Sequence, residues 1–112
     1  MQLGSVVSIA NSGLRAETRR LEQSAQNVAN INTDGYAAQR VESRSEAHGG
    51  VSTAVYTRQG LPAQAGGAAP ESTTDLAEET VSQISSQHAF TANLAVLRTA
   101  DAMLGELVDR KA

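Results

Sequence analysis

The chain has 112 residues, a net charge of -3 and a pI near 5.3, with one Phe, two Tyr, no Trp and no Cys. The acidic balance disfavours a nucleic-acid partner, and the lack of Cys excludes disulfides and thiolate metal sites. Because so few aromatic side chains are present, Ala, Val, Leu and Ile must fill the core, and we expect neighbouring subunits to supply much of the burial.

The N-terminal third of the chain predicts one long amphipathic helix, from about residue 3 to residue 31. Apolar residues recur there every seven positions, at Val7, Leu14, Leu21 and Val28. At about 1.5 Å per residue such a helix is on the order of 40 Å long, more than a compact domain of this size needs. We expect Gly13 either to bend this helix or to admit a close neighbour.

A turn and a short β-hairpin are predicted next. Asn30, Asp34 and Gly35 end the helix, because Asn and Asp compete for backbone hydrogen bonds and Gly permits a positive φ. Residues 37–58 predict the hairpin, in which Gly49-Gly50 forms the turn before the second strand. Gly, Pro and Ala are frequent in residues 59–72, which indicates a flexible linker.

A second long helix is predicted to begin near Asp75, which has the character of an N-cap and is followed by Glu78 and Glu79 in the first turn. Its apolar residues form two adjacent stripes, and this favours burial by several helix neighbours. The predicted fold class is therefore mainly α. Residues 1–36 and 73–112 carry the terminal helices, which pair as an antiparallel helical hairpin or coiled coil and form one assembly domain.

No arrangement of residues indicates catalysis, a metal or a cofactor. His48 and His88 lie in a turn and in a helix without a second helical His, and we expect His88 to pack at the helix interface. Glu78 and Glu79 are adjacent, so they point about 100° apart and cannot act together as general acid and base. An enzyme, such as a small cell-wall hydrolase, has no residues to support it.

Three amides and one carboxylate near apolar helix positions allow two interpretations. Asn27, Asn30 and Asn93 either set helix register through buried hydrogen bonds or face water. Asp101 lies between Leu97 and Leu104, where an unpaired buried carboxylate would be costly. The candidate partners of Asp101 are three basic residues of the first helix, Arg15, Arg19 and Arg20.

Both ends of the chain resemble one family, the axial proteins of the bacterial flagellar rod and hook. The family's N-terminal pattern has a helix with Gly-Leu and Ala, then Asn-Ile-Ala-Asn and Thr-Pro-Gly-Tyr. The matching residues here are Ser12-Gly13-Leu14-Arg15-Ala16, Asn27-Val28-Ala29-Asn30 and Thr33-Asp34-Gly35-Tyr36. The C-terminal pattern, an acidic helix start and then Arg-Ala-Tyr-x-Ala-Asn, resembles Asp75-Leu76-Ala77-Glu78-Glu79 and His88-Ala89-Phe90-Thr91-Ala92-Asn93. Asp34, His88 and Phe90 depart from the pattern, which has Pro, Arg and Tyr there.

The resemblance implies a structural subunit of the periplasmic rod of the flagellar basal body, which transmits torque. The short middle region is similar to that of proximal-rod proteins of the FlgC type, because hook and distal-rod relatives carry larger insertions. The implied partners are copies of the chain itself, other rod proteins and the flagellar type III export apparatus. Residues 1–5 lack the pattern of a secretory signal, and no segment approaches the ~20 apolar residues of a membrane span, so we expect export without signal cleavage.

The predicted assembly interface combines apolar packing residues with residues that set geometry. A soluble helical adaptor that binds one partner with defined stoichiometry is the alternative function. The interface residues are Leu14, Leu21, Asn27, Val28, Ala29, Asn30, Thr33, Gly35, Tyr36, Phe90, Asn93, Leu94, Leu97, Asp101 and Leu104.

Overall fold

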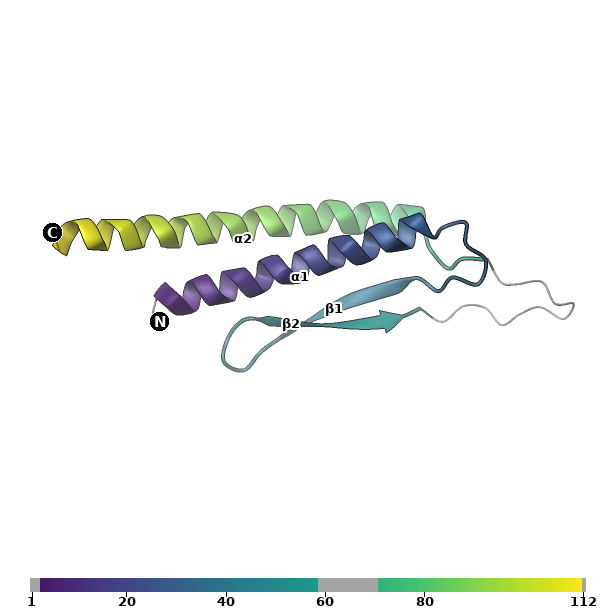
Figure 1. Ribbon diagram of the computed structural model, residues 1–112, viewed down its shortest axis with the longest axis horizontal. Coiled ribbons are helices and arrows are strands. Elements are labelled where there is room, and N and C mark those ends of the chain that lie inside the picture. Colours follow the sequence, from purple (N-terminus) through teal and green to yellow (C-terminus); the bar gives the residue numbers. More distant parts are fainter. Residues whose placement is uncertain (1–2, 59–70, 112) are drawn as a thin grey trace, which may run out of the picture.

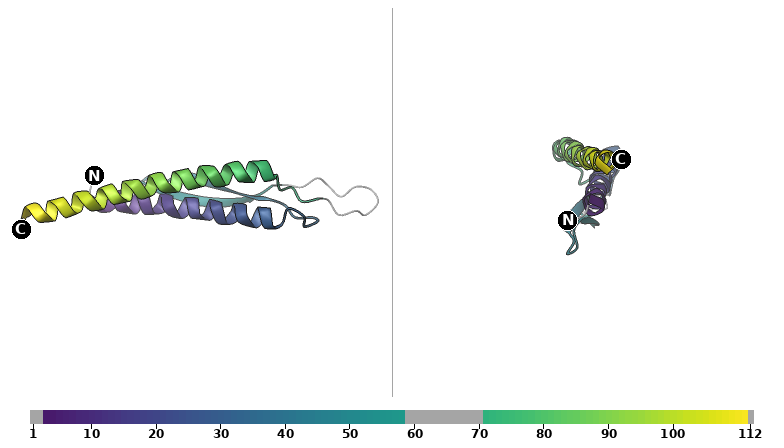
Figure 2. Two further views of the ribbon diagram at one scale, coloured as in Figure 1. Left: turned by 90° about the horizontal axis from the view of Figure 1, so that it is seen from above. Right: turned by 90° about the vertical axis from the view of Figure 1, so that its left-hand side faces the viewer.

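The computed structural model describes residues 3–58 and 71–111. In chain order it contains helix α1 (Leu3–Ala29), strands β1 (Gln39–Ser45) and β2 (Val51–Thr57), and helix α2 (Leu76–Lys111). The molecule is an elongated rod of 76 × 25 × 14 Å. Two antiparallel helices lie side by side, and the hairpin covers the side of α1 that faces away from α2 (Figures 1 and 2).

Small side chains form the seam between α1 and α2. Gly13 lies against Asn93, where a Cβ atom on Gly13 would come within 2.7 Å of the Asn93 Oδ1 atom. Further along the seam, Ser24 is 3% exposed and its hydroxyl donates to the Glu79 carbonyl oxygen. Since Gly13 has no side chain and Ser24 has a short one, the two helices approach closely along the seam.

The hairpin docks on α1 through its turn and one face. Gly49 and Gly50 have φ of 92° and 93°, a backbone conformation that favours glycine, and both lie against α1. The Ser12 hydroxyl of α1 accepts a hydrogen bond from the Val51 amide at 3.1 Å, which fixes the turn to the helix. The antiparallel register pairs Val41 with Val55, and Val41 is buried against α1.

The predicted fold class is confirmed, with two long helices and a short hairpin between them. The first helix ends at Ala29, two residues before the expected position, and the second begins at Leu76. Its N-cap is Asp75, whose carboxylate accepts from the backbone amides of Ala77 and Glu78 at 3.0 and 3.3 Å. Gly13 admits a close neighbour. The predicted linker, apart from its last two residues, lies outside the described residues.

Candidate assembly interface

The turn after α1 contains four residues predicted as interface residues, and their side-chain hydrogen bonds lie within residues 26–36. Asn30 accepts a hydrogen bond from the Thr33 hydroxyl at 3.1 Å and donates to the Gln26 carbonyl oxygen at 2.8 Å. Gly35 has a φ of 76°, so only a residue that tolerates the left-handed region fits there. The turn thereby directs Tyr36 back toward α1, where its hydroxyl donates to the Asn27 Oδ1 atom at 2.9 Å.

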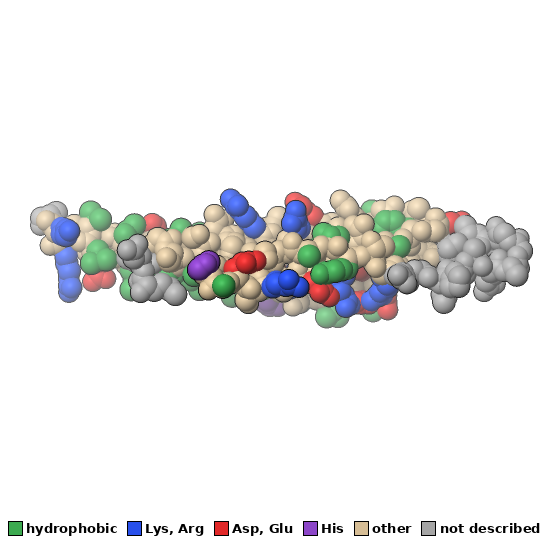
Figure 3. Space-filling model, turned by 90° about the horizontal axis from the view of Figure 1, so that it is seen from below, with side chains coloured by type: hydrophobic (Ala, Val, Ile, Leu, Met, Phe, Trp, Pro, Cys, Tyr) green, Lys and Arg blue, Asp and Glu red, His purple; other side chains and the backbone are tan. Residues whose placement is uncertain are grey.

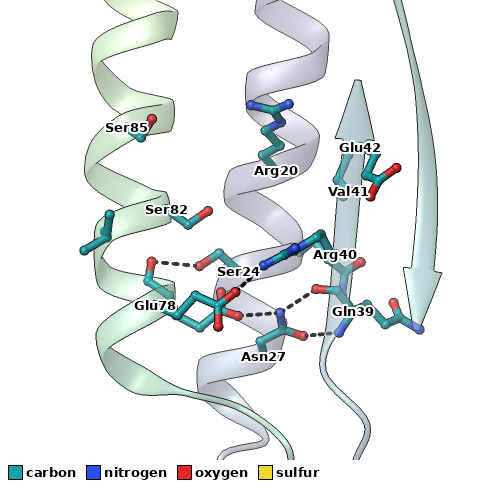
Figure 4. A pocket seen from close by; sticks show the side chains of 13 residues that line it. Arg20, Ser24, Asn27, Gln39, Arg40, Val41, Glu42, Glu78, Ser82 and Ser85 are labelled. Carbon is teal, nitrogen blue, oxygen red and sulfur yellow. Dashed lines mark hydrogen bonds and ion pairs between the residues drawn. The ribbon is translucent and has the colours of Figure 1, made fainter. Parts of the chain in front are cut away.

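Asn27 is the largest fully buried side chain of the described residues, at 1% exposure, and its amide is fully hydrogen-bonded. The Nδ2 group donates to the Gln39 carbonyl oxygen at 2.7 Å and to the Glu79 carboxylate at 2.9 Å. The Oδ1 atom accepts from the Tyr36 hydroxyl and from the Gln39 amide, each at 2.9 Å. Both hydrogens and both lone pairs of this amide are therefore used, and one side chain joins α1, β1 and α2 (Figure 4).

We call this cluster the Asn27 joint; it comprises Asn27, Tyr36, Gln39, Thr74 and Glu79. The Thr74 hydroxyl completes it by donating to the Asn27 carbonyl oxygen at 3.1 Å. Burial, and then the nearby negative charge of Glu79, raise the pKa of Tyr36. Because the folded-state pKa is raised, the phenol's contribution to stability is present at neutral pH and is lost as pH rises through the folded-state pKa.

Glu78, next to the joint, ties the start of α2 to both strands at the open end of the hairpin. Its carboxylate accepts from the Arg58 guanidinium at 2.7 Å. It also pairs with Arg40 of β1, as Figure 4 shows. Hydrogen bonds from Arg58 and Arg40 lower the pKa of Glu78. We call these three residues the Glu78 clasp; it keeps Glu78 ionised at neutral pH and links α2 to the hairpin.

Two family models match the chain. One, described as Flagella basal body rod protein, matches residues 8–36, and the other, described as Flagellar basal body rod FlgEFG protein C-terminal, matches residues 65–110. The chain belongs to the flagellar basal body rod proteins. This confirms the family inferred from the two terminal motifs. No curated protein matches the chain.

Membership makes the chain a structural component of the basal body rod, assembled with other rod proteins. The two matches contain all residues of the Asn27 joint except Gln39, because Asn27 and Tyr36 lie in the first match, and Thr74 and Glu79 lie in the second. In residues 3–58 and 71–111 of this rod protein, neither helix combines the length and apolar character that crossing a membrane requires. The same residues contain no group of three His, Asp or Glu placed to bind a metal ion.

The large apolar residues of the rod protein lie beside the seam and remain partly open. Leu14, Val28, Leu94 and Leu97 are half-buried. Leu21 is 45% exposed, Phe90 38% and Leu104 49%. One open groove of about 510 Å³ runs between the helices and contains Leu21, Ile84 and Phe90. Within a single chain these side chains therefore still have apolar surface available for neighbours.

Two of the predicted interface residues, and one residue expected at the helix interface, have exposed side chains in the described part of the chain. Ala29 and Asp101 are exposed, and so is His88, which was expected at the helix interface. Arg19 and Arg20, considered as partners for Asp101, instead donate to Thr53 and Ser43 of the hairpin, each at 2.8 Å. The remaining amide, Asn93, is half-buried against Gly13 and donates to the Ala89 carbonyl oxygen of its own helix.

The sequence interpretation included Asn93 but missed the other seam residues of α2 and the pairing of Asn27 with Glu79. Glu79, Ser86, Asn93 and Ala100 recur every seven residues, and each faces or is buried with α1. Because two of them are polar and two are small, a search for large apolar side chains does not find them. A heptad search that includes small residues would have found this seam.

Proposed function

We propose that this chain is a subunit of the proximal rod, of the FlgC type, which polymerises through its terminal helices and transmits torque. We further propose that it leaves the cell through the flagellar type III export apparatus without signal cleavage and assembles in the periplasm. The observation that carries the proposal is the pair of antiparallel terminal helices whose large apolar side chains stay partly exposed in one chain. Such surfaces are stabilised when neighbouring subunits cover them.

The short middle of the chain supports a place in the proximal rod. Its described part contains two seven-residue strands, which form one further layer on α1 (Figure 1). A subunit of this shape can pack closely around an axis. The Asn27 joint and the Glu78 clasp would hold the helices and hairpin as one stiff unit, which suits a part that transmits torque.

Cryo-electron microscopy of basal bodies tests this function, using a motile strain that carries the chain and a strain from which it is deleted. We expect density for the chain in the rod nearest the inner membrane of the first strain, and no motility in the second. Density only in the distal rod would contradict the proximal assignment. A chain absent from basal bodies, but bound in a small complex of fixed stoichiometry, would instead support the adaptor.

A further inference from the structure

The C-terminal end of α2 extends past α1 and carries its own apolar face. Asn27 contacts Glu79 and Gly13 contacts Asn93, and this antiparallel register places Leu3 opposite about residue 103. The end of α2 projects past α1 in Figures 1 and 2. Residues 101–111, here called the overhang, are all exposed. Four large apolar side chains of the overhang are 49–63% exposed: Met103, Leu104, Leu107 and Val108.

The overhang continues the face that α2 turns toward α1. Leu107 follows Ala100 by seven residues, so it occupies the next position of the seam. The seam residue changes from Ala100, which is buried, to the larger Leu107, which lies where α1 no longer covers α2. Lys111 lies on the same face, one turn beyond Leu107, whereas Glu106 lies off this face. Hydrophobic, basic and acidic side chains are visible together at this end of the molecule (Figure 3).

The groove between the helices combines apolar side chains with a carboxylate, which complement the apolar and basic side chains of the overhang. Its apolar residues are Leu21, Ile84 and Phe90, and Ile84 is 52% exposed. Glu17 also lines the groove; its Oε1 atom pairs with Arg20 at 3.5 Å, and its Oε2 atom is buried without a hydrogen-bond partner in the described residues. An unsatisfied buried carboxylate oxygen favours an occupant that brings a positive charge or a donor.

We propose that the overhang of one copy packs into the groove of a second copy, with Lys111 near Glu17. The two surfaces cannot meet within one chain, because Gln87 and Leu107 lie on the same helix on the order of 30 Å apart. The contact is therefore head-to-tail and leaves a free overhang and a free groove at the ends of every row. This inference rests on the proposed rod function and names the surfaces through which copies join.

Disulfide cross-linking of the full chain tests the contact, and the chain is suited to it because it contains no Cys. Leu107→Cys and Ile84→Cys are purified separately, checked for helicity by circular dichroism, mixed and oxidised. We expect about tenfold more mixed dimer than from Leu107→Cys with Ala54→Cys, because docking raises the local thiol concentration. Ala54 is exposed on the hairpin and serves as the matched control position.

Equal yields from the two mixtures would overturn the proposal, as would a predominance of Leu107→Cys homodimers. Adding Lys111→Glu to the Leu107→Cys protein should reduce the yield, and adding Glu17→Lys to the Ile84→Cys protein should restore it. A charge swap that restores nothing would contradict the placement of Lys111.

Cross-linking of the same Cys pair in isolated basal bodies distinguishes a failure of the contact between copies from a failure of the proposed function. A chain found in the rod without the cross-link, or cross-linked there to a different protein, overturns the contact between copies and leaves the rod function intact. A chain absent from the rod overturns the proposed function, while the purified protein still decides whether the contact forms.

Discussion

At the scale of single residues, Asn27 is the most constrained side chain of the rod protein. It is buried, and its amide uses every donor and acceptor on groups from the turn after α1, from β1 and from α2. A carboxylate or an apolar group of similar size could not satisfy the same four partners. Asn30 belongs to the same motif, but its side chain is bound to Gln26 and Thr33, which are within four residues of it. The two asparagines of this motif therefore have different roles.

Replacing Asn27 by Ala should lower the free energy of unfolding by about 2–4 kcal/mol, because the Gln39 amide and the Tyr36 hydroxyl lose their buried partner. Urea unfolding followed by circular dichroism measures the change. Asn30→Ala is the control and should cost no more than about 0.5 kcal/mol. Equal midpoints for the two variants would show that the joint does not stabilise the fold.

At the scale of elements, the helices and the hairpin are held by close approach and by polar contacts more than by large apolar side chains. The buried hydrophobic residues of the described chain are four alanines and one valine. The Glu78 clasp and the hydrogen bonds from Arg19 and Arg20 then fix the hairpin. Stability within one chain is therefore sensitive to small changes in side-chain volume at the seam.

Gly13→Ala tests this sensitivity. The added methyl group would lie 2.7 Å from the Asn93 Oδ1 atom, so overpacking should outweigh the gain in helix propensity and leave a net loss of about 1–2 kcal/mol. Gly105→Ala is the matched control, because nothing lies within 4 Å of its added Cβ, and it should stabilise by about 0.5–1 kcal/mol. Thermal unfolding of both variants checks the signs. Adding Asn93→Ala to Gly13→Ala should recover part of the loss.

Glu78→Gln should loosen the hairpin, because it removes the charge that pairs with Arg40 and Arg58. Hydrogen exchange of the amides in β1 and β2 should become several-fold faster at pH 7. Since the folded-state pKa of Glu78 lies below its usual 4.5, its contribution is present above pH 4.5 and is lost as pH falls through the lowered value. Glu42→Gln, on the exposed face of the hairpin, should leave exchange unchanged. If both variants exchange alike, the clasp does not hold the hairpin.

Much of the element order could be predicted from the sequence, and the pairing of the elements could not. Heptad spacing and the Asp75 cap predict the helices, and Gly49-Gly50 predicts the hairpin turn, because these signals act over a few residues. The partnership of Asn27 with Glu79 joins positions 52 residues apart, and the Glu78 clasp depends on how the hairpin lies on α1. Local patterns do not encode such contacts.

At the scale of the whole molecule, the rod protein is long and thin and leaves apolar surface on the helix pair and the overhang uncovered. A 76 Å rod that is 14 Å thick has little interior in which to bury large side chains. Burial of Leu21, Phe90 and Leu107 therefore requires neighbours. Stability of the assembled state should exceed that of the single chain by the apolar area that assembly covers.

Leu107→Asp should abolish motility and leave the single chain folded, because Leu107 lies beyond the part of α2 that α1 covers and is 54% exposed. Ala102→Asp adds the same charge to the overhang away from its apolar face, and should retain motility. Swimming in soft agar and circular dichroism of the purified variants measure the two effects. Normal swimming of the Leu107→Asp strain would show that the overhang carries no assembly contact.

The Asn27 joint also has a consequence for the order in which the chain can fold. Its groups from residues 27, 36 and 39 are present early in the chain, but Thr74 and Glu79 come from a segment made much later. Until that segment arrives, one amide hydrogen of Asn27 lacks its partner, and closing the intervening loop has an entropic cost. The N-terminal half of the chain therefore cannot complete the hydrogen bonds of the Asn27 joint by itself. A chain passing through a channel with its N-terminus first would reach its final rigidity only after its last third had emerged.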